Sequence, residues 1–184
     1  MGKQDSYAAA FGGINYFRFN SDQSVTIKPL IVSEDNKKII FDNMLSFWTG
    51  IARPSESILE EQCRNHQKNQ LVLQKIREQA DTMSDYFISD DLSVERVGKL
   101  LHEGWTLKKQ LSSNITTSKI DRLYDIALKN GALGGKLSGA GSGGFLNVIA
   151  TKDRHEQIVK KMKEADLVLY KFNKAPNGAQ VMVV

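Results

Sequence analysis

The chain has 184 residues, 41% of them hydrophobic and 25% charged, a composition typical of a globular protein. Its net charge of +4 comes from interleaved basic and acidic residues, which argues against a nucleic-acid partner. No apolar run approaches the roughly 20 residues of a membrane-spanning helix, and no signal peptide is recognisable, so no membrane partner is expected. The single cysteine, Cys63, excludes an internal disulfide and favours a cytoplasmic location.

The first fifty residues predict one helix and three strands. In chain order these are a helix over 4–11, the strands of a hairpin at 15–19 and 24–28, and a third strand over 38–49. The glycine pair Gly12-Gly13 ends the helix, and the third strand is broken around Asp42.

Helices dominate the middle of the chain and alternate with strands after it. The expected helices run from 54 to about 79, from Ser93 to the residues after Trp105, from a capping Ser118 to Asn130, and over 153–165; the expected strands are 145–150, 167–172 and 180–184. The polar stretch 61–70 is compatible with either a break or a long exposed helix, and Trp105 is expected in the core. Antiparallel strands alternating with helices indicate an α+β fold, an antiparallel sheet with helices packed on one face.

Residues 134–144 form the most distinctive segment, Gly-Gly-Lys-Leu-Ser-Gly-Ala-Gly-Ser-Gly-Gly, which holds six of the 14 glycines. Glycine weakens regular structure, and such a run usually lets the backbone turn sharply with its N–H groups outward, as in anion-binding loops. The dinucleotide fingerprint also fits, as Gly139-x-Gly141-x-x-Gly144, but it requires a helix where a strand is expected. A flexible linker, which would make residues 138–144 mobile, is the remaining alternative.

The glycine run resembles the third motif of the GHMP kinase superfamily, roughly Lys-x-Ser/Thr-Gly-Ala-Gly-Gly-Gly-Gly. The segment Lys136–Gly144 departs from it at Ser142, where glycine is commoner. Far upstream, Gly2-Lys-Gln-Asp5 is similar to the segment with the family's active-site aspartate. This similarity also accounts for Gly2, which with Ser6 partly matches a myristoylation signal.

Other stretches resemble the branch of sugar-1-kinases that act on D-glycero-D-manno-heptose 7-phosphate. They are Thr49-Gly-x-x-Arg53, His102-Glu-Gly-Trp-Thr-Leu-Lys-Lys109 and Ile120-Asp-x-x-Tyr124. The resemblance implies phosphorylation of the anomeric hydroxyl of a heptose 7-phosphate, with ATP and the sugar phosphate as partners. Mg²⁺ would arrive with ATP, and its ligands are expected mainly outside this chain because no His/Cys/Asp cluster has metal-ligand spacing.

The resemblance also implies the residues of the site. Asp5 is the expected catalytic carboxylate, which orients or deprotonates the attacking hydroxyl. The expected substrate- or phosphate-binding residues are Lys3, Arg53, Ser138, Gly139, Ala140, Gly141, Ser142 and Gly143. Lys136, which precedes the tight turn, is expected to be structural.

One family feature has no counterpart in the sequence: the nucleotide loop, a Pro-x-x-x-Gly-Leu-Gly-Ser-Ser-like segment. We therefore expect residues 1–43 to be a remnant of an N-terminal kinase domain, residues 44–184 to be the C-terminal domain, and the chain alone to be inactive. Apolar hairpin residues such as Phe17, Phe19 and Ile27 would then lack packing partners, which predicts a homodimer or strand exchange through residues 1–30. The alternatives are a kinase for another sugar and a catalytically inactive fold module.

Overall fold

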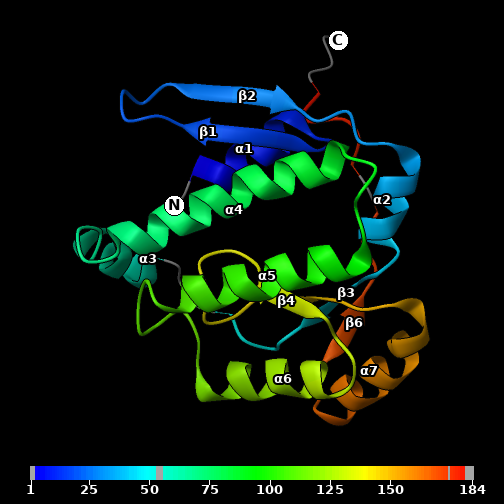
Figure 1. Ribbon diagram of the computed structural model, residues 1–184. Helices are drawn as coiled ribbons and strands as arrows, with labels where there is room; N and C mark the ends of the chain where they lie inside the picture. The colour runs from blue at the N-terminus through cyan, green and yellow to red at the C-terminus, as the bar shows by residue number, and fades with distance from the viewer. Residues whose placement is uncertain (1–2, 53–55, 174, 181–184) are drawn as a thin grey trace.

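The structure is a computed structural model that describes residues 3–52, 56–173 and 175–180 (Figure 1). The elements follow the order α1 (Lys3–Phe11), β1 (Asn15–Phe19), β2 (Val25–Pro29), α2 (Glu34–Phe41), β3 (Met44–Trp48), α3 (Glu56–Arg64), α4 (Gln70–Ile88), α5 (Val94–Lys109), α6 (Ser118–Lys129), β4 (Gly134–Leu137), β5 (Phe145–Ile149), α7 (Lys152–Glu164) and β6 (Val168–Tyr170). They form a two-stranded sheet, β1-β2, and an antiparallel four-stranded sheet with the order β4-β5-β3-β6.

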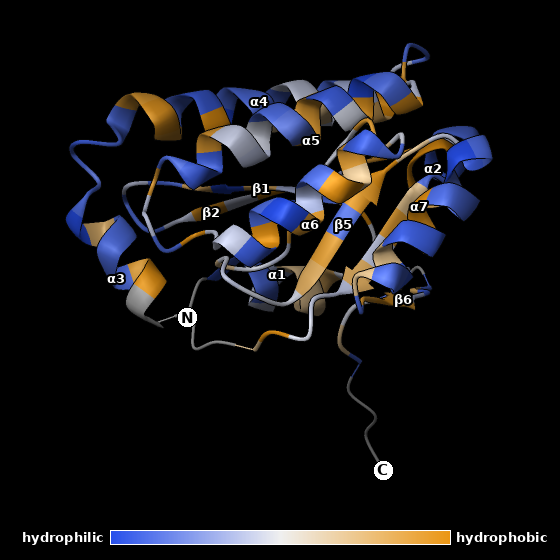
Figure 2. Cartoon of the chain, turned by 90° about the horizontal axis from the view of Figure 1, so that it is seen from below, coloured by the Kyte–Doolittle hydropathy of each residue, from blue (hydrophilic) through white to orange (hydrophobic). Residues whose placement is uncertain are grey.

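The four-stranded sheet packs helices α5, α6 and α7 on one face, which confirms the expected α+β fold. Phe47 of β3 lies opposite Leu146 of β5, and both are buried in one cluster with Trp105 of α5 and Ile158 of α7. In Figure 2, β5 is mostly hydrophobic, whereas the outer turns of α7 are hydrophilic. Trp105 is only 1% exposed, so its expected place in the core is confirmed.

Helix α5 lies directly on β4 because both carry glycine at the contact. A Cβ atom at Gly134 would be 1.9 Å from the carbonyl oxygen of Gly98, so a side chain there would push the helix away from the strand. This close approach sets how near the first half of α5 lies to β4, and the last turn of the same helix carries Lys108 and Lys109.

Helix α1 is held against the hairpin by aromatic side chains and by the C-terminal segment. Tyr7 makes edge contacts with Phe17 and Phe19 at ring-centroid distances of 6.0 and 5.5 Å. The amide of Gly13 donates to the carbonyl of Ala175 at 2.9 Å, so residues 175–179 close over the end of the helix. Phe17 therefore has packing partners, contrary to expectation.

The predicted third strand is wrong over its first residues. Residues 34–41 form helix α2, and only Met44–Trp48 is a strand. The Ser33 hydroxyl caps α2 by accepting from the amide of Asn36, and the Asn36 side chain donates to the carbonyls of Phe87 and Ser89 at 3.1 and 2.8 Å. Phe87 and Ser89 lie 51 and 53 residues further along the chain. Their contacts with Asn36 stabilise the helix although the sequence at its C-terminal end is β-prone.

Three other boundaries differ from the predictions. The polar stretch 61–70 contains a break, one of its two expected alternatives, which divides the helix predicted from 54 to about 79 into α3 and α4; α4 then continues past the predicted end to Ile88. Thr117, not Ser118, caps α6, since its hydroxyl accepts from the amide of Ile120. The strand expected at 167–172 is limited to β6, residue 180 has no strand conformation, and residues 181–184 lie outside the described part of the chain.

The hairpin predicts self-association between two copies of the chain. Phe11 and Phe19 are 49% and 43% exposed, and within the described residues β1 and β2 pair only with each other, which leaves unpaired strand edges. We expect the wild-type chain to dimerise in light scattering and Phe11→Ser/Phe19→Ser to be monomeric. Leu71→Ser, at a 74% exposed position on α4, should dimerise as the wild type does. A monomeric wild type at high concentration would refute this prediction.

Candidate functional site

The glycine-rich loop, residues 138–144, joins β4 to β5 and is packed against two other segments. The amide of Ser142 donates to the carbonyl of Ile115 at 2.7 Å, and the amide of Gly144 donates to the carbonyl of Ile51 at 2.9 Å. Ser142 is only 2% exposed. This packing contradicts the linker interpretation, and the antiparallel β4-loop-β5 connection contradicts the dinucleotide fingerprint, which needs a helix after the loop.

The loop needs residues that tolerate left-handed backbone conformations. The φ angles are +72° at Gly139, +128° at Gly141 and +59° at Ser142. A Cβ atom at Gly141 would lie 2.6 Å from the carbonyl oxygen of Ile115, so both conformation and space require glycine there. Ser142 occupies a conformation that glycine adopts more easily, and its hydroxyl donates to the carbonyl of Asn114.

Several backbone N–H groups of the loop have no partner among the described residues. Within the part of the chain that the structure describes, the amides of Gly139, Ala140, Gly141 and Gly143 have no hydrogen-bond acceptor. Consecutive unpaired amides in a loop with left-handed residues form the concave donor arrangement that binds anions in proteins. The structure thus brings together four of the residues predicted to bind phosphate.

Two half-buried lysines and an exposed carboxylate surround this loop. The Lys108 ammonium, at the end of α5, donates to the carbonyl of Gly139. Burial lowers the pKa of Lys108 to about 8, aided by repulsion from Lys136 and opposed by attraction to Asp5. Burial also lowers the pKa of Lys136, and Asp5 again opposes the shift. Asp5, on the first turn of α1, therefore acts on both lysines from more than 100 residues away.

Ser138 is held by a relay of side chains from β3 and β5. The Ser46 hydroxyl donates to the Asn147 amide oxygen at 2.6 Å, and the Asn147 amide nitrogen donates to the Ser138 hydroxyl oxygen at 2.6 Å. Because Ser138 accepts from Asn147, its own hydroxyl proton is directed away from that partner. Ser138 is exposed and can donate to a ligand beside the loop.

The remaining predicted residues are less informative. Lys3 is exposed at the start of α1, and Arg53 lies outside the described residues.

Among the described residues, no group of three or more His, Cys, Asp or Glu side chains could hold a metal ion. None of the helices in the described ranges is long and apolar enough to span a membrane.

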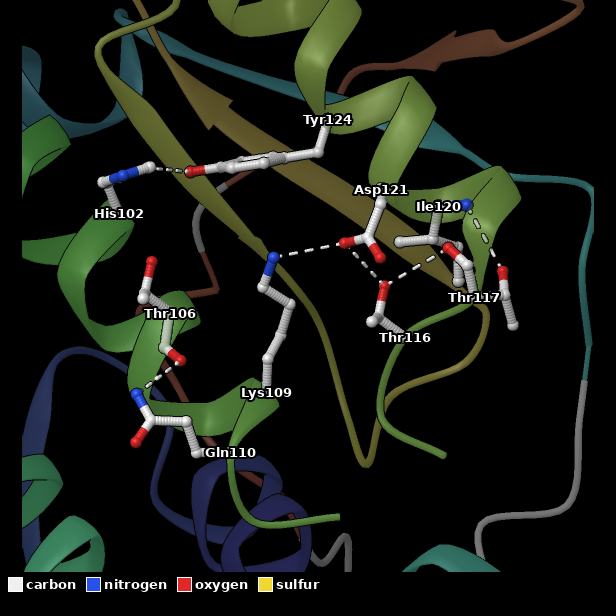
Figure 3. A network of polar contacts seen from close by, with 9 residues as sticks. All are labelled: His102, Thr106, Lys109, Gln110, Thr116, Thr117, Ile120, Asp121 and Tyr124. Atoms are coloured by element: carbon white, nitrogen blue, oxygen red, sulfur yellow. Dashed lines mark hydrogen bonds and ion pairs between the residues drawn. The ribbon is translucent and has the colours of Figure 1, made fainter. Parts of the chain in front are cut away.

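The heptose-branch residues around α5 and α6 mainly connect the two helices (Figure 3). His102 Nδ1 and the Tyr124 hydroxyl are 2.8 Å apart, and burial raises the pKa of Tyr124 to about 12. Lys109 forms an ion pair with Asp121 at 3.2 Å, whereas Lys108 donates to Gly139 of the glycine-rich loop. The adjacent lysines Lys108 and Lys109 therefore have different roles.

Sequence reasoning missed Lys108 as a site residue and treated Lys136 as structural. Lys108 meets Gly139 across 31 residues, and periodicity cannot reveal such a contact. The only signal was its place in the Trp-Thr-Leu-Lys-Lys stretch of the resemblance.

A separate cavity of about 890 Å³ lies between α4 and α5. Charged side chains of both signs line it, among them Lys75, Glu78 and Lys99, and no residue of the glycine-rich loop does.

Residues 89–166 match the family model "GHMP kinases C terminal". The match assigns residues 89–166 to the GHMP kinase C-terminal domain. The matched residues include α5, the glycine-rich loop, Lys108 and Lys136. The segment that resembles the third GHMP kinase motif therefore lies within the match.

Two curated proteins are similar to the chain. The D-glycero-alpha-D-manno-heptose 7-phosphate kinase of Campylobacter jejuni is 26% identical over 186 residues, which cover 97% of this chain and 53% of that protein. The mevalonate kinase of Methanocaldococcus jannaschii is 34% identical over 73 residues, which cover 40% of this chain and 22% of that protein. The chain thus spans about half the length of the heptose phosphate kinase that it matches.

Solved structures of GHMP kinases share the fold. A D-glycero-D-manno-heptose 1-phosphate kinase from Bacteroides thetaiotaomicron aligns with a TM-score of 0.71 at 24% identity, covering all of this chain and 50% of its own. The mevalonate kinase of L. major, solved with R-mevalonate, aligns with a TM-score of 0.69 at 21% identity over 95% of this chain and 53% of its own. At these identities the structures show a common fold and leave the substrate open.

Proposed function

We propose that this chain supplies the phosphoryl-binding and base-bearing part of an ATP-dependent sugar kinase. The observation that carries the proposal is the arrangement of Asp5, Lys108 and Lys136 around the free amides of one loop. A carboxylate beside lysines and backbone donors can orient a hydroxyl while the phosphoryl group that it attacks is neutralised.

Each part has a separate chemical role. The loop amides and the two lysines would stabilise negative charge on the transferring phosphoryl group, since preformed donors need little reorganisation during the reaction. Asp5 would accept the proton of the sugar hydroxyl, and Ser138 would donate a hydrogen bond to the sugar or its phosphate. Mg²⁺ would neutralise phosphate charge as part of the ATP complex, with its ligands mainly outside this chain.

We favour a heptose 7-phosphate as the sugar, with transfer to its anomeric hydroxyl. The support is the Campylobacter jejuni heptose 7-phosphate kinase, which is similar over 97% of this chain. A kinase for another sugar is the first alternative. The boundary between residues 1–43 and 44–184, as remnant and C-terminal domain, remains a prediction, as does a cytoplasmic location.

The second alternative is a module without activity of its own. It is favoured by the sequence, which has no Gly-Leu-Gly-Ser-Ser-like nucleotide loop. We expect no sugar-dependent release of ADP when the 184-residue chain is incubated with Mg²⁺-ATP and heptose 7-phosphate. Calorimetry should nevertheless show saturable binding of heptose 7-phosphate and weaker binding of mevalonate. Release of ADP would refute the expected inactivity, and equal binding of both compounds would refute the sugar assignment.

The pKa of Lys108 predicts that anion binding depends on pH. Lys108 is protonated below its pKa of about 8 and neutral above it, so the affinity for inorganic pyrophosphate should fall as the pH rises through about 8. Lys108→Met should bind more weakly and lose this pH dependence, whereas Lys109→Met should retain it because Lys109 pairs with Asp121. Titration calorimetry between pH 6.5 and 9.5, chosen to bracket the pKa of about 8, measures this. An unchanged pH profile in Lys108→Met would contradict the assignment.

A further inference from the structure

Glu61 of α3 lies outside the site but binds the segment beneath it. Its carboxylate oxygen Oε2 accepts from the Ser112 hydroxyl at 2.6 Å and from the Asn114 side-chain amide at 2.8 Å. The other oxygen, Oε1, accepts from both the amide and the hydroxyl of Ser113 at 3.2 Å. These four hydrogen bonds also lower the pKa of Glu61, although burial acts in the opposite direction.

The segment that Glu61 holds is the one on which the glycine-rich loop rests. The carbonyl of Asn114 accepts from the Ser142 hydroxyl, and the carbonyl of Ile115 accepts from the Ser142 amide at 2.7 Å. Gly141 lies against the same Ile115 backbone. A continuous set of contacts therefore runs from α3 through residues 112–115 to Ser142, the left-handed residue that sets the direction of the neighbouring amides.

Both ends of this segment are fixed by other contacts. At its start, the Asn69 side chain donates to the carbonyl of Leu111 at 2.7 Å. At its end, the Thr116 hydroxyl donates to Asp121 at 3.1 Å, as Figure 3 shows. Residues 112–114, between these anchors, are held from α3 by Glu61 alone among the described residues. Glu61 is thus the residue that ties this segment to α3, while Ser142 contacts it from the glycine-rich loop.

We propose that Glu61 is a positioning residue for the phosphate-binding loop. The inference rests on the proposed function, because it assigns Glu61 to the orientation of the amides that would bind a phosphoryl group. Glutamine at this position keeps one oxygen acceptor but turns an N–H₂ group toward two donors, so about half of the hydrogen bonds are lost. Residues 112–114 would shift, and the Asn114 and Ile115 carbonyls that accept from Ser142 would no longer be held in place.

Whether Glu61→Gln weakens or strengthens anion binding distinguishes a positioning role of Glu61 from a purely electrostatic one. Glu61→Gln removes a negative charge, so charge alone would strengthen the binding of an anion. Loss of positioning would weaken it. Glu60→Gln is the matched control, since Glu60 is an exposed residue on the same helix, loses the same charge and has no side-chain hydrogen bond within the described chain.

The test is a titration of the wild-type chain, Glu61→Gln and Glu60→Gln with inorganic pyrophosphate, followed by amide NMR well below the unfolding temperature. We expect Glu61→Gln to bind about five- to tenfold more weakly, the effect of about one lost hydrogen bond. Its Ser142 amide should also exchange with solvent faster. The Glu60→Gln variant should bind as tightly as the wild type or slightly more tightly.

The outcomes distinguish this inference from the proposed function. Equal or tighter binding by Glu61→Gln, with an unchanged Ser142 exchange rate, would overturn the positioning role and leave the site intact. Wild-type chain that binds no pyrophosphate would instead overturn the proposed function. If Glu61→Gln does not fold, Ser113→Ala, which removes one hydroxyl donor and keeps the backbone amide, should show a smaller loss in the same direction, and its absence would overturn the role.

Discussion

Replacing Asp5 by asparagine is expected to slow phosphoryl transfer by about two to four orders of magnitude in a catalytically active polypeptide that contains these residues. Asparagine has almost the same shape but cannot accept a proton from the sugar hydroxyl. Asp5 is exposed on the first turn of α1, so the fold should be unaffected. Steady-state kinetics should show the loss in kcat, with a smaller change in KM.

The same substitution should act in the opposite direction on anion binding. Asp5 attracts Lys108 and Lys136, so at a pH well below the Lys108 pKa of about 8, where Lys108 stays protonated, its removal leaves both lysines freer to bind pyrophosphate. We expect Asp5→Asn to bind pyrophosphate at least as tightly as the wild type while it loses turnover. Asp35→Asn, an exposed carboxylate that pairs with Lys38 on α2, is the control and should change neither. Near-normal turnover in Asp5→Asn would refute its role as the base.

The second large effect is expected from Gly141→Ala in the glycine-rich loop. An alanine Cβ there would lie 2.6 Å from the Ile115 carbonyl oxygen, with φ at +128°. Overpacking costs about 1–3 kcal/mol and a left-handed backbone about 1–2 kcal/mol. The free energy of unfolding should therefore fall by about 2–5 kcal/mol in urea denaturation.

Gly139→Ala is the matched variant. Gly139 also has a positive φ, +72°, but a Cβ atom there would meet no atom within 4 Å. Only the backbone cost remains, so the expected loss is about 1–2 kcal/mol. Equal destabilisation by the two substitutions would mean that the contact with Ile115 does not hold the loop.

Local patterns in the sequence predicted much of the fold. Alternating residues revealed the hairpin, and the apolar face from Val94 to Trp105 revealed α5. Strand β4 was missed because Gly134 and Gly135 have poor strand propensity, and they are needed where α5 and β5 approach the strand closely. Helix α2 was mistaken for a strand because its apolar end, Ile39-Ile40-Phe41, is β-prone and its stabilising contacts come from α4.

Residues of the site could be predicted only where they belong to a motif that resembles a known family. Asp5 and the glycine-rich loop were identified through a family resemblance, and the structure brings Asp5 close enough to act on both lysines near the loop. Glu61 belongs to no recognised motif, and Lys108 lies in a branch-specific stretch that does not by itself indicate a role in the site. Their importance comes from contacts with Gly139 and with residues 112–114, and these contacts exist only once α5, α3 and the loop are packed together.

The central claim is that the glycine-rich loop binds phosphoryl groups, and amide NMR of the wild-type chain during a pyrophosphate titration tests it most directly. The claim predicts saturable shifts of the Gly139, Ala140, Gly141 and Gly143 amides, the four that are unpaired in the described structure. The shifts should weaken above the Lys108 pKa of about 8. Saturable binding that leaves these four amides unchanged, or no binding at all, would contradict the claim.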